Sequence, residues 1–210
     1  MTMVRVKICG IRRVEDALAA IACGADFIGI VLAPSRRRVP LEVARDILAT
    51  CRREAPGSWA AVGVFADMPL EEVRRAVEVC GFDVVQLCGG EDRDYCLSVG
   101  RPVFRAVHIP VDSGVRVVVG RPGEYGAERL VLDARVPGLY GGTGVRFPWE
   151  FARAFAEGNL VAGGLTPENV GEAVRTLGPW GVDVSSGVER DGWKDPHLMR
   201  AFVEAARSVR

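Results

Sequence analysis

The sequence predicts an α/β protein of the (β/α)8 TIM-barrel class, with a single catalytic domain over residues 1–210. Short runs rich in Val, Ile, Leu and Phe alternate with amphipathic helical patterns along the whole chain. This alternation predicts right-handed βαβ units and a parallel sheet. No G-x-G-x-x-G motif follows the first predicted strand, and no break in composition divides the chain into halves. A closed barrel is therefore favoured over an open, doubly wound sheet.

Eight segments are predicted to be strands, because each is short, apolar and bounded by Gly, Pro or Asp. In chain order they are 4–9, 26–32, 59–65, 83–87, 102–107, 129–133, 159–163 and 181–185. Helices are expected between them. The run PLEEVRRAVEVC, for example, places Leu70, Val73 and Val77 at helical spacing. The weakest unit is 110–128, which the pattern assigns either to a degenerate helix or to a loop.

Composition argues against several classes of protein. The chain has 27 basic and 27 acidic residues, so a formal net charge of zero argues against binding nucleic acid or a membrane surface by bulk electrostatics. No apolar run reaches the roughly 18–20 residues that span a bilayer. The N-terminus lacks the apolar segment of a signal peptide, so a cytoplasmic location is expected. With six cysteines, no C-x-x-C pair and two histidines, we expect reduced thiols, no metal and no cofactor.

The C-terminal ends of the predicted strands supply the candidate functional residues, because barrel enzymes carry their chemistry there. Cys9 ends the first strand, Gln86 and Cys88 end the fourth, and Asp133 ends the sixth. Three arginines, 36–38, follow the second strand. Each also has a structural interpretation: a cysteine can fill a core, an arginine run can be a solvated surface, and an aspartate can cap a turn.

Two loops rich in glycine and serine predict a phosphate site. They follow the seventh and eighth strands, where this fold commonly binds phosphate. Thr166 and Pro167 are expected to open the helix after the first loop, as its N-cap and first helical residue. Glycine lets the backbone approach an anion closely. The candidate ligands of a small phosphorylated substrate are Gly163, Gly164, Ser185, Ser186 and Gly187.

The first strand, VRVKICG, places Lys7 and Cys9 on one face, because side chains alternate along a strand. A free thiol has a pKa of about 8.5 and is mostly protonated at neutral pH. We therefore expect Lys7 to favour the Cys9 thiolate. Strand eight closes the barrel against strand one, and Asp183 shares the strand face of Ser185. This predicts a supporting ion pair between Lys7 and Asp183 beneath the substrate.

Seven motifs occur in order between residues 7 and 195: KICGI, SRRRV, VGVF, VQLCG, LDA…YGGTG, AGGLTPENV and VDVSSGVE…WKD. Together they resemble the phosphoribosylanthranilate isomerase family of tryptophan biosynthesis. The resemblance implies an Amadori rearrangement of N-(5-phosphoribosyl)anthranilate to 1-(2-carboxyphenylamino)-1-deoxyribulose 5-phosphate. It also implies that Cys9 is the general base and Asp133 the general acid. The ligand of the anthranilate carboxylate is then Arg37, with Arg36 and Arg38 as alternatives in the same motif.

Three positions depart from the family's pattern. Cys88 stands where histidine is usual, Pro148 where aspartate is common, and Arg105 where lysine is common. The family includes monomers, dimers and fused domains, so we expect a monomer or a homodimer.

Other functions remain as alternatives. The bifunctional isomerase of histidine and tryptophan synthesis uses an aspartate base where this chain has Cys9. Ribulose-phosphate epimerases need metal-binding His and Asp at strand ends, and the predicted strand ends lack that set. A non-catalytic barrel that binds sugar phosphates, or senses redox state through its cysteines, is the alternative outside enzymes.

Overall fold

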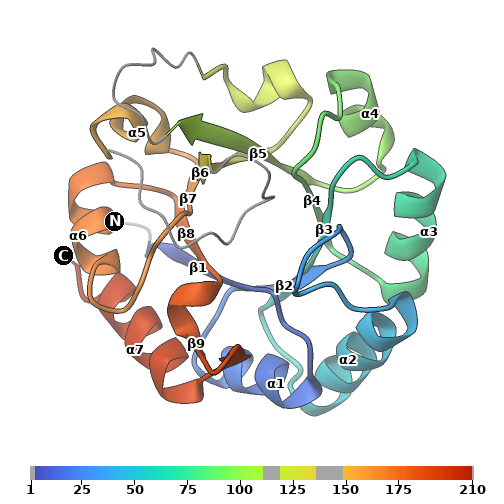
Figure 1. The fold of residues 1–210 in the computed structure, drawn as a ribbon, viewed down its shortest axis with the longest axis horizontal. Coiled ribbons are helices and arrows are strands. Elements are labelled where there is room, and N and C mark those ends of the chain that lie inside the picture. Colours follow the sequence, from blue (N-terminus) through green and yellow to red (C-terminus); the bar gives the residue numbers. More distant parts are fainter. Residues whose placement is uncertain (1–2, 111–118, 136–148, 210) are drawn as a thin grey trace.

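A computed structural model describes residues 3–110, 119–135 and 149–209 (Figure 1). Eight parallel strands close into a barrel in sequence order, with β8 paired to β1. Figure 1 looks along this barrel and shows the helices as a ring around it. The predicted fold class is confirmed. No helix of the described residues is long and apolar enough to cross a membrane.

The strands follow the predicted ranges closely. The two largest differences are in β5, which continues to Pro110 because it pairs with β6 from Phe104 onward, and in β7, which has only two residues. The positive φ angles of Gly163 (82°) and Gly164 (63°) turn the chain out of the sheet and account for the short β7. The strands are β1 (Arg5–Cys9), β2 (Phe27–Val31), β3 (Ala60–Phe65), β4 (Val84–Leu87), β5 (Val103–Pro110), β6 (Arg129–Arg135), β7 (Leu160–Val161) and β8 (Gly181–Val184).

In the described residues, helices follow all the strands from β1 to β7 except β5, and the predicted helix at 69–80 is α3, with Pro69 as its N-cap. Of the weak unit 110–128, the structure shows a 3-10 turn, η1 (Pro122–Tyr125), while 111–118 lies outside the described residues. The helices are α1 (Val14–Ala22), α2 (Leu41–Glu54), α3 (Leu70–Cys80), α4 (Arg93–Ser98), α5 (Trp149–Ala156), α6 (Val170–Leu177) and α7 (Pro196–Arg207). A second 3-10 turn, η2 (Ser186–Val188), leads into a small hairpin, β9 (Glu189–Arg190) and β10 (Trp193–Lys194).

The start of α6 corrects one prediction. The helix begins at Val170 with Asn169 as its N-cap, and not at Thr166 and Pro167. The side chain of Asn169 accepts a hydrogen bond from the backbone N–H of Thr166 and donates one to the carbonyl of Gly164, both at 2.9 Å. These bonds hold the preceding residues in a turn, because an amide side chain can replace backbone partners there.

Aromatic rings fill the N-terminal end of the barrel interior. Phe27, Phe104 and Trp180 pack with ring centroids 5.5–6.2 Å apart. Above them, buried apolar side chains such as Val62 and Val131 continue the interior layer. With this end packed by apolar groups, polar side chains can gather at the C-terminal end.

Candidate active site

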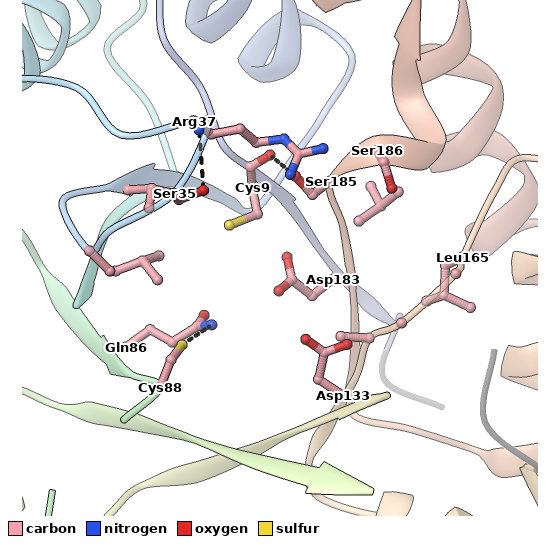
Figure 2. A pocket seen from close by; sticks show the side chains of 17 residues that line it. Cys9, Ser35, Arg37, Gln86, Cys88, Asp133, Leu165, Asp183, Ser185 and Ser186 are labelled. Atoms are coloured by element: carbon pink, nitrogen blue, oxygen red, sulfur yellow. Dashed lines mark hydrogen bonds between the residues drawn. The ribbon is translucent and has the colours of Figure 1, made fainter. Parts of the chain in front are cut away.

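A pocket opens among the C-terminal ends of the strands and the loops that follow them (Figure 2). All the predicted site residues line it except Lys7, which lies beneath it, and Gly187. Figure 2 shows Cys9 and Asp133 entering from different strands, with Asp183 between them in this view. The sequence thus brought the candidate side chains to one place, as the barrel topology requires.

The ion pair predicted inside the barrel is confirmed. Nζ of Lys7 lies 3.0 Å from both carboxylate oxygens of Asp183, and the two residues are register partners on β1 and β8. Lys7 is fully buried. Burial alone would lower the pKa of Lys7, but Asp183 and the neighbouring Cys9 raise it above its ordinary value. The ammonium therefore stays charged beneath the pocket.

Opposing effects act on the pKa of the Cys9 thiol. Burial raises its pKa, Asp183 adds to the rise, and the opposing effect of Lys7 and Lys194 is smaller. Lys7 lowers the pKa and so favours the thiolate, as expected, but the pKa of Cys9 in the free protein is above its ordinary value. The physical reason is that Asp183 neutralises much of the Lys7 charge while the pocket removes water from the sulfur.

The two predicted phosphate loops pack against each other. A Cβ placed on Gly187 would lie 1.9 Å from the carbonyl oxygen of Leu165, so only glycine allows this approach. The Ser185 hydroxyl donates a hydrogen bond to the Cys9 carbonyl at 3.0 Å, which ties the second loop to β1. Because Gly187 makes this contact outside the pocket lining, its predicted role as a phosphate ligand stays a prediction.

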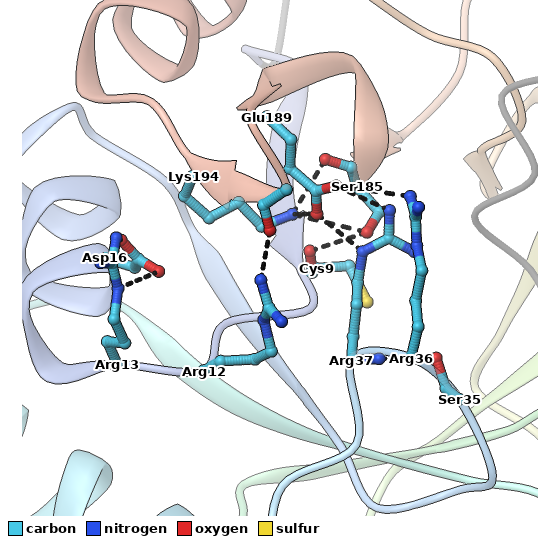
Figure 3. Close-up of polar contacts among 11 residues, drawn as sticks. Cys9, Arg12, Arg13, Asp16, Ser35, Arg36, Arg37, Ser185, Glu189 and Lys194 are labelled. Carbon is cyan, nitrogen blue, oxygen red and sulfur yellow. Dashed lines mark hydrogen bonds and ion pairs between the residues drawn. The ribbon is translucent and has the colours of Figure 1, made fainter.

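Arg37 lies at the pocket wall, held by two groups (Figure 3). Its backbone N–H donates to the Ser35 hydroxyl at 3.1 Å. Its guanidinium forms a two-bond ion pair with Glu189, and Lys194 donates to the same carboxylate at 2.9 Å. Glu189 and Lys194 were not among the residues predicted from the sequence. Two signals pointed to them: Lys194 is one of only two lysines in the chain, and both residues lie in the motif VDVSSGVE…WKD.

Metal ligands do not gather in the part of the chain that is described. Among residues 3–110, 119–135 and 149–209, no three or more His, Cys, Asp or Glu side chains are placed to hold a metal ion.

Comparison with known proteins identifies the family. The family model described as N-(5'-phosphoribosyl)anthranilate isomerase matches residues 6–205. A relative of that name from Roseiflexus sp. (strain RS-1) is 43% identical over 212 residues, which cover 99% of both chains. The chain belongs to the N-(5'-phosphoribosyl)anthranilate isomerase family.

Solved structures of isomerases from this family share the fold. The crystal structure of the enzyme from Thermus thermophilus has a TM-score of 0.81 and 40% identity, covering 99% of this chain and all of that one. A phosphoribosylanthranilate isomerase in complex with reduced 1-(o-carboxyphenylamino)-1-deoxyribulose 5-phosphate has a TM-score of 0.78 and 31% identity. The match to that complex also covers 99% of this chain and all of the other.

The structure shows the contacts of Cys88 and Arg105, two residues that depart from the isomerase family's usual pattern. Cys88 accepts a hydrogen bond from Nε2 of Gln86 at 3.4 Å, and burial raises the pKa of its thiol to about 12. Burial therefore favours the protonated form of this thiol. Arg105 donates to the carbonyls of Leu87 (2.9 Å) and Gly89 (2.6 Å), which braces the chain on either side of Cys88. The third departure, Pro148, lies outside the described residues.

Proposed function

We propose that this chain, an isomerase of tryptophan biosynthesis, uses Cys9 as general base and Asp133 as general acid in the Amadori rearrangement of N-(5'-phosphoribosyl)anthranilate. The product is 1-(2-carboxyphenylamino)-1-deoxyribulose 5-phosphate. The observation that carries the proposal is the meeting of these two side chains in one pocket, with Arg37 and the two phosphate loops around it. Family membership over nearly the whole chain supports the same reaction.

The reaction proceeds by proton transfers. Asp133 gives a proton to the furanose ring oxygen as the C1–O bond breaks and the nitrogen lone pair forms the C1=N bond of a Schiff base. Cys9, as thiolate, removes the proton from C2, and the electron pair forms the C1=C2 bond of an enolamine while the π electrons of the C1=N bond return to nitrogen. Protonation at C1 and loss of the enol proton give the ketone. Acid and base catalysis of this kind contribute roughly 10²–10⁴-fold each.

The buried pair beneath the pocket supports the base. Formation of the thiolate places a negative charge near the Lys7 ammonium, which stabilises it. Asp183 holds Lys7 in place through the ion pair, and Gln86 fixes the neighbouring wall through its bond to Cys88. A base with a raised pKa removes a carbon-bound proton more effectively, provided that it is ionised when the substrate is bound.

Anion recognition completes the proposal. Arg37 binds the anthranilate carboxylate, and Gly163, Gly164, Ser185, Ser186 and Gly187 hold the phosphate. A guanidinium suits a planar carboxylate, and backbone N–H groups of glycine-rich loops suit a phosphate. Since the reaction consists of proton transfers, it requires no cofactor.

The test is to mix the purified protein with N-(5'-phosphoribosyl)anthranilate and follow the decay of its fluorescence. We expect decay at a rate proportional to protein concentration, with the ketose recovered as product by chromatography. Binding of the substrate without turnover would contradict the proposal and favour the alternative, a non-catalytic sugar-phosphate-binding barrel. Three further properties stay predictions: one domain over residues 1–210, a cytoplasmic location, and a monomeric or homodimeric state. Light scattering would measure the oligomeric state.

A further inference from the structure

A buried ionic cluster joins Arg37, the predicted ligand of the carboxylate, to Glu189 and Lys194 (Figure 3). Nε of Arg37 donates to Oε1 of Glu189 at 2.6 Å, and Nη2 donates to Oε2 at 2.8 Å. Nζ of Lys194 donates to Oε1 at 2.9 Å. The three side chains are 6%, 7% and 1% exposed, so little water competes for these bonds.

Glu189 stays an anion in this cluster. Burial would raise its pKa, but the hydrogen bonds of Arg37 and the charge of Lys194 lower it to about 2. One carboxylate thus faces two buried cations, and the cluster keeps a positive charge on the side of the pocket that Arg37 lines. An anionic ligand fits there without displacing Glu189, which does not itself line the pocket.

The geometry selects one edge of the guanidinium for a ligand. An arginine has five N–H donors, of which Glu189 takes the one on Nε and one on Nη2. Among the residues that the structure describes, Nη1 of Arg37 has no hydrogen-bond acceptor. The aliphatic stem of Arg37 lies over Gly10, where a Cβ would be 2.4 Å from Cδ. The edge formed by Nη1 and the second N–H of Nη2 is the one left for a carboxylate in the pocket.

The same cluster is tied to a phosphate loop. Nζ of Lys194 also donates to the carbonyl oxygen of Ser185 at 2.9 Å. The Ser185 hydroxyl in turn bonds the carbonyl of Cys9. The arginine that follows β2 is therefore fixed relative to the loop that follows β8.

We propose that Glu189 is a positioning residue that presents the Nη1–Nη2 edge of Arg37 to the substrate carboxylate at a set spacing from the phosphate loop. This inference rests on the proposed function, because it requires a substrate with a carboxylate at one end and a phosphate at the other. The specificity that follows is for ligands carrying both anions, since a ligand with phosphate alone gains nothing from the orientation of Arg37.

The test compares two inhibitors in wild type, Glu189→Gln, Arg37→Ala and the double variant. The first is reduced 1-(o-carboxyphenylamino)-1-deoxyribulose 5-phosphate, which carries both anions, and the second is inorganic phosphate. In Glu189→Gln we expect the inhibition constant of the reduced analogue to rise about 10- to 100-fold, the range for one charge-assisted hydrogen bond. The constant for phosphate should change by less than about twofold. In the Arg37→Ala background, Glu189→Gln should raise the inhibition constant of the analogue by less than about twofold more.

Controls separate the possible failures. Arg36→Ala is the matched variant, because Arg36 lies 3.5 Å from Glu189 but its side chain is 68% exposed, and we expect it to leave both constants unchanged. Wild-type protein that does not turn over substrate would overturn the proposed function instead. If the wild type is active, three results would each overturn the role of Glu189. Glu189→Gln could leave the inhibition constant of the analogue unchanged, or raise the constants of both inhibitors equally. It could also raise the constant of the analogue in the Arg37→Ala background as much as in the wild type. If Glu189→Gln does not fold, Glu189→Asp, which keeps the charge but draws the guanidinium back, must show the same contrast between inhibitors.

Discussion

Two buried ion pairs border the pocket, and they are built in different ways. Lys7 and Asp183 lie directly opposite each other on paired strands, so the hydrogen bonds of the sheet set their distance. Arg37 and Glu189 come from a loop and from the small hairpin after β8, and only side-chain bonds join them. The interior pair lies beside Cys9, the proposed base, whereas the rim pair holds Arg37, the proposed ligand of the substrate carboxylate. Strand register thus positions the proposed base, and loop contacts position the proposed carboxylate ligand.

The largest expected effect concerns Asp133, the proposed general acid. Asp133→Asn keeps the shape of the side chain but cannot supply a proton to the ring oxygen. We expect kcat to fall by roughly 10²–10⁴-fold while the circular dichroism spectrum stays that of the wild type. If the folded variant retains about a tenth or more of the wild-type kcat, Asp133 is not the general acid.

The interior pair should be costly to break. Asp183→Asn leaves the fully buried Lys7 ammonium without its carboxylate, and we expect the free energy of unfolding to fall by roughly 3–5 kcal/mol. Denaturant unfolding measures this loss. The matched control is Asp46→Asn, which breaks an ion pair with Arg45 whose side chains are 66% and 53% exposed, and which should cost at most about 1 kcal/mol. If the two variants lost equal free energies of unfolding, the buried interior pair would stabilise the protein no more than an exposed ion pair does.

The rim pair, Arg37 and Glu189, should contribute less to the free energy of unfolding in acid. The pKa of Glu189 is lowered from 4.5 to about 2, so its contribution is present above its unfolded value and is lost as pH falls toward 2. The shift corresponds to about 3 kcal/mol of unfolding free energy. Denaturant titrations at several acidic pH values should show this loss in the wild type and not in Glu189→Gln. Parallel curves for the two proteins would contradict the assignment.

The smallest effect concerns recognition at the rim. Arg37→Ala should raise KM by about 10- to 100-fold with little change in kcat, because the carboxylate it binds is remote from C1 and C2. Arg36→Ala and Arg38→Ala should change KM far less, since both side chains are exposed. A larger cost at position 36 or 38 would shift the assignment of the carboxylate ligand by one residue.

The sequence predicted what strand alternation and register control. Alternation placed Lys7 and Cys9 on one face, and barrel closure brought Asp183 to Lys7, as found. It could not show that Arg37 pairs with Glu189, because a contact across 152 residues between a loop and a hairpin depends on the path of both. The sequence correctly predicted that Lys7 favours the Cys9 thiolate, but it could not give the net direction of the pKa shift, since the balance of burial, Lys7 and Asp183 depends on how much water the folded pocket excludes.

The two pocket thiols offer the most direct test of the account. Cys9 and Cys88 are 9% and 8% exposed and both line the pocket, so Cys9→Ala and Cys88→Ala remove the same atom from equally buried positions. The measurement is kcat for the disappearance of N-(5'-phosphoribosyl)anthranilate with each variant. The account predicts a loss of roughly 10²–10⁴-fold for Cys9→Ala and of less than about tenfold for Cys88→Ala. Near-normal turnover by Cys9→Ala, or equal losses in the two variants, would contradict the assignment of Cys9 as the base.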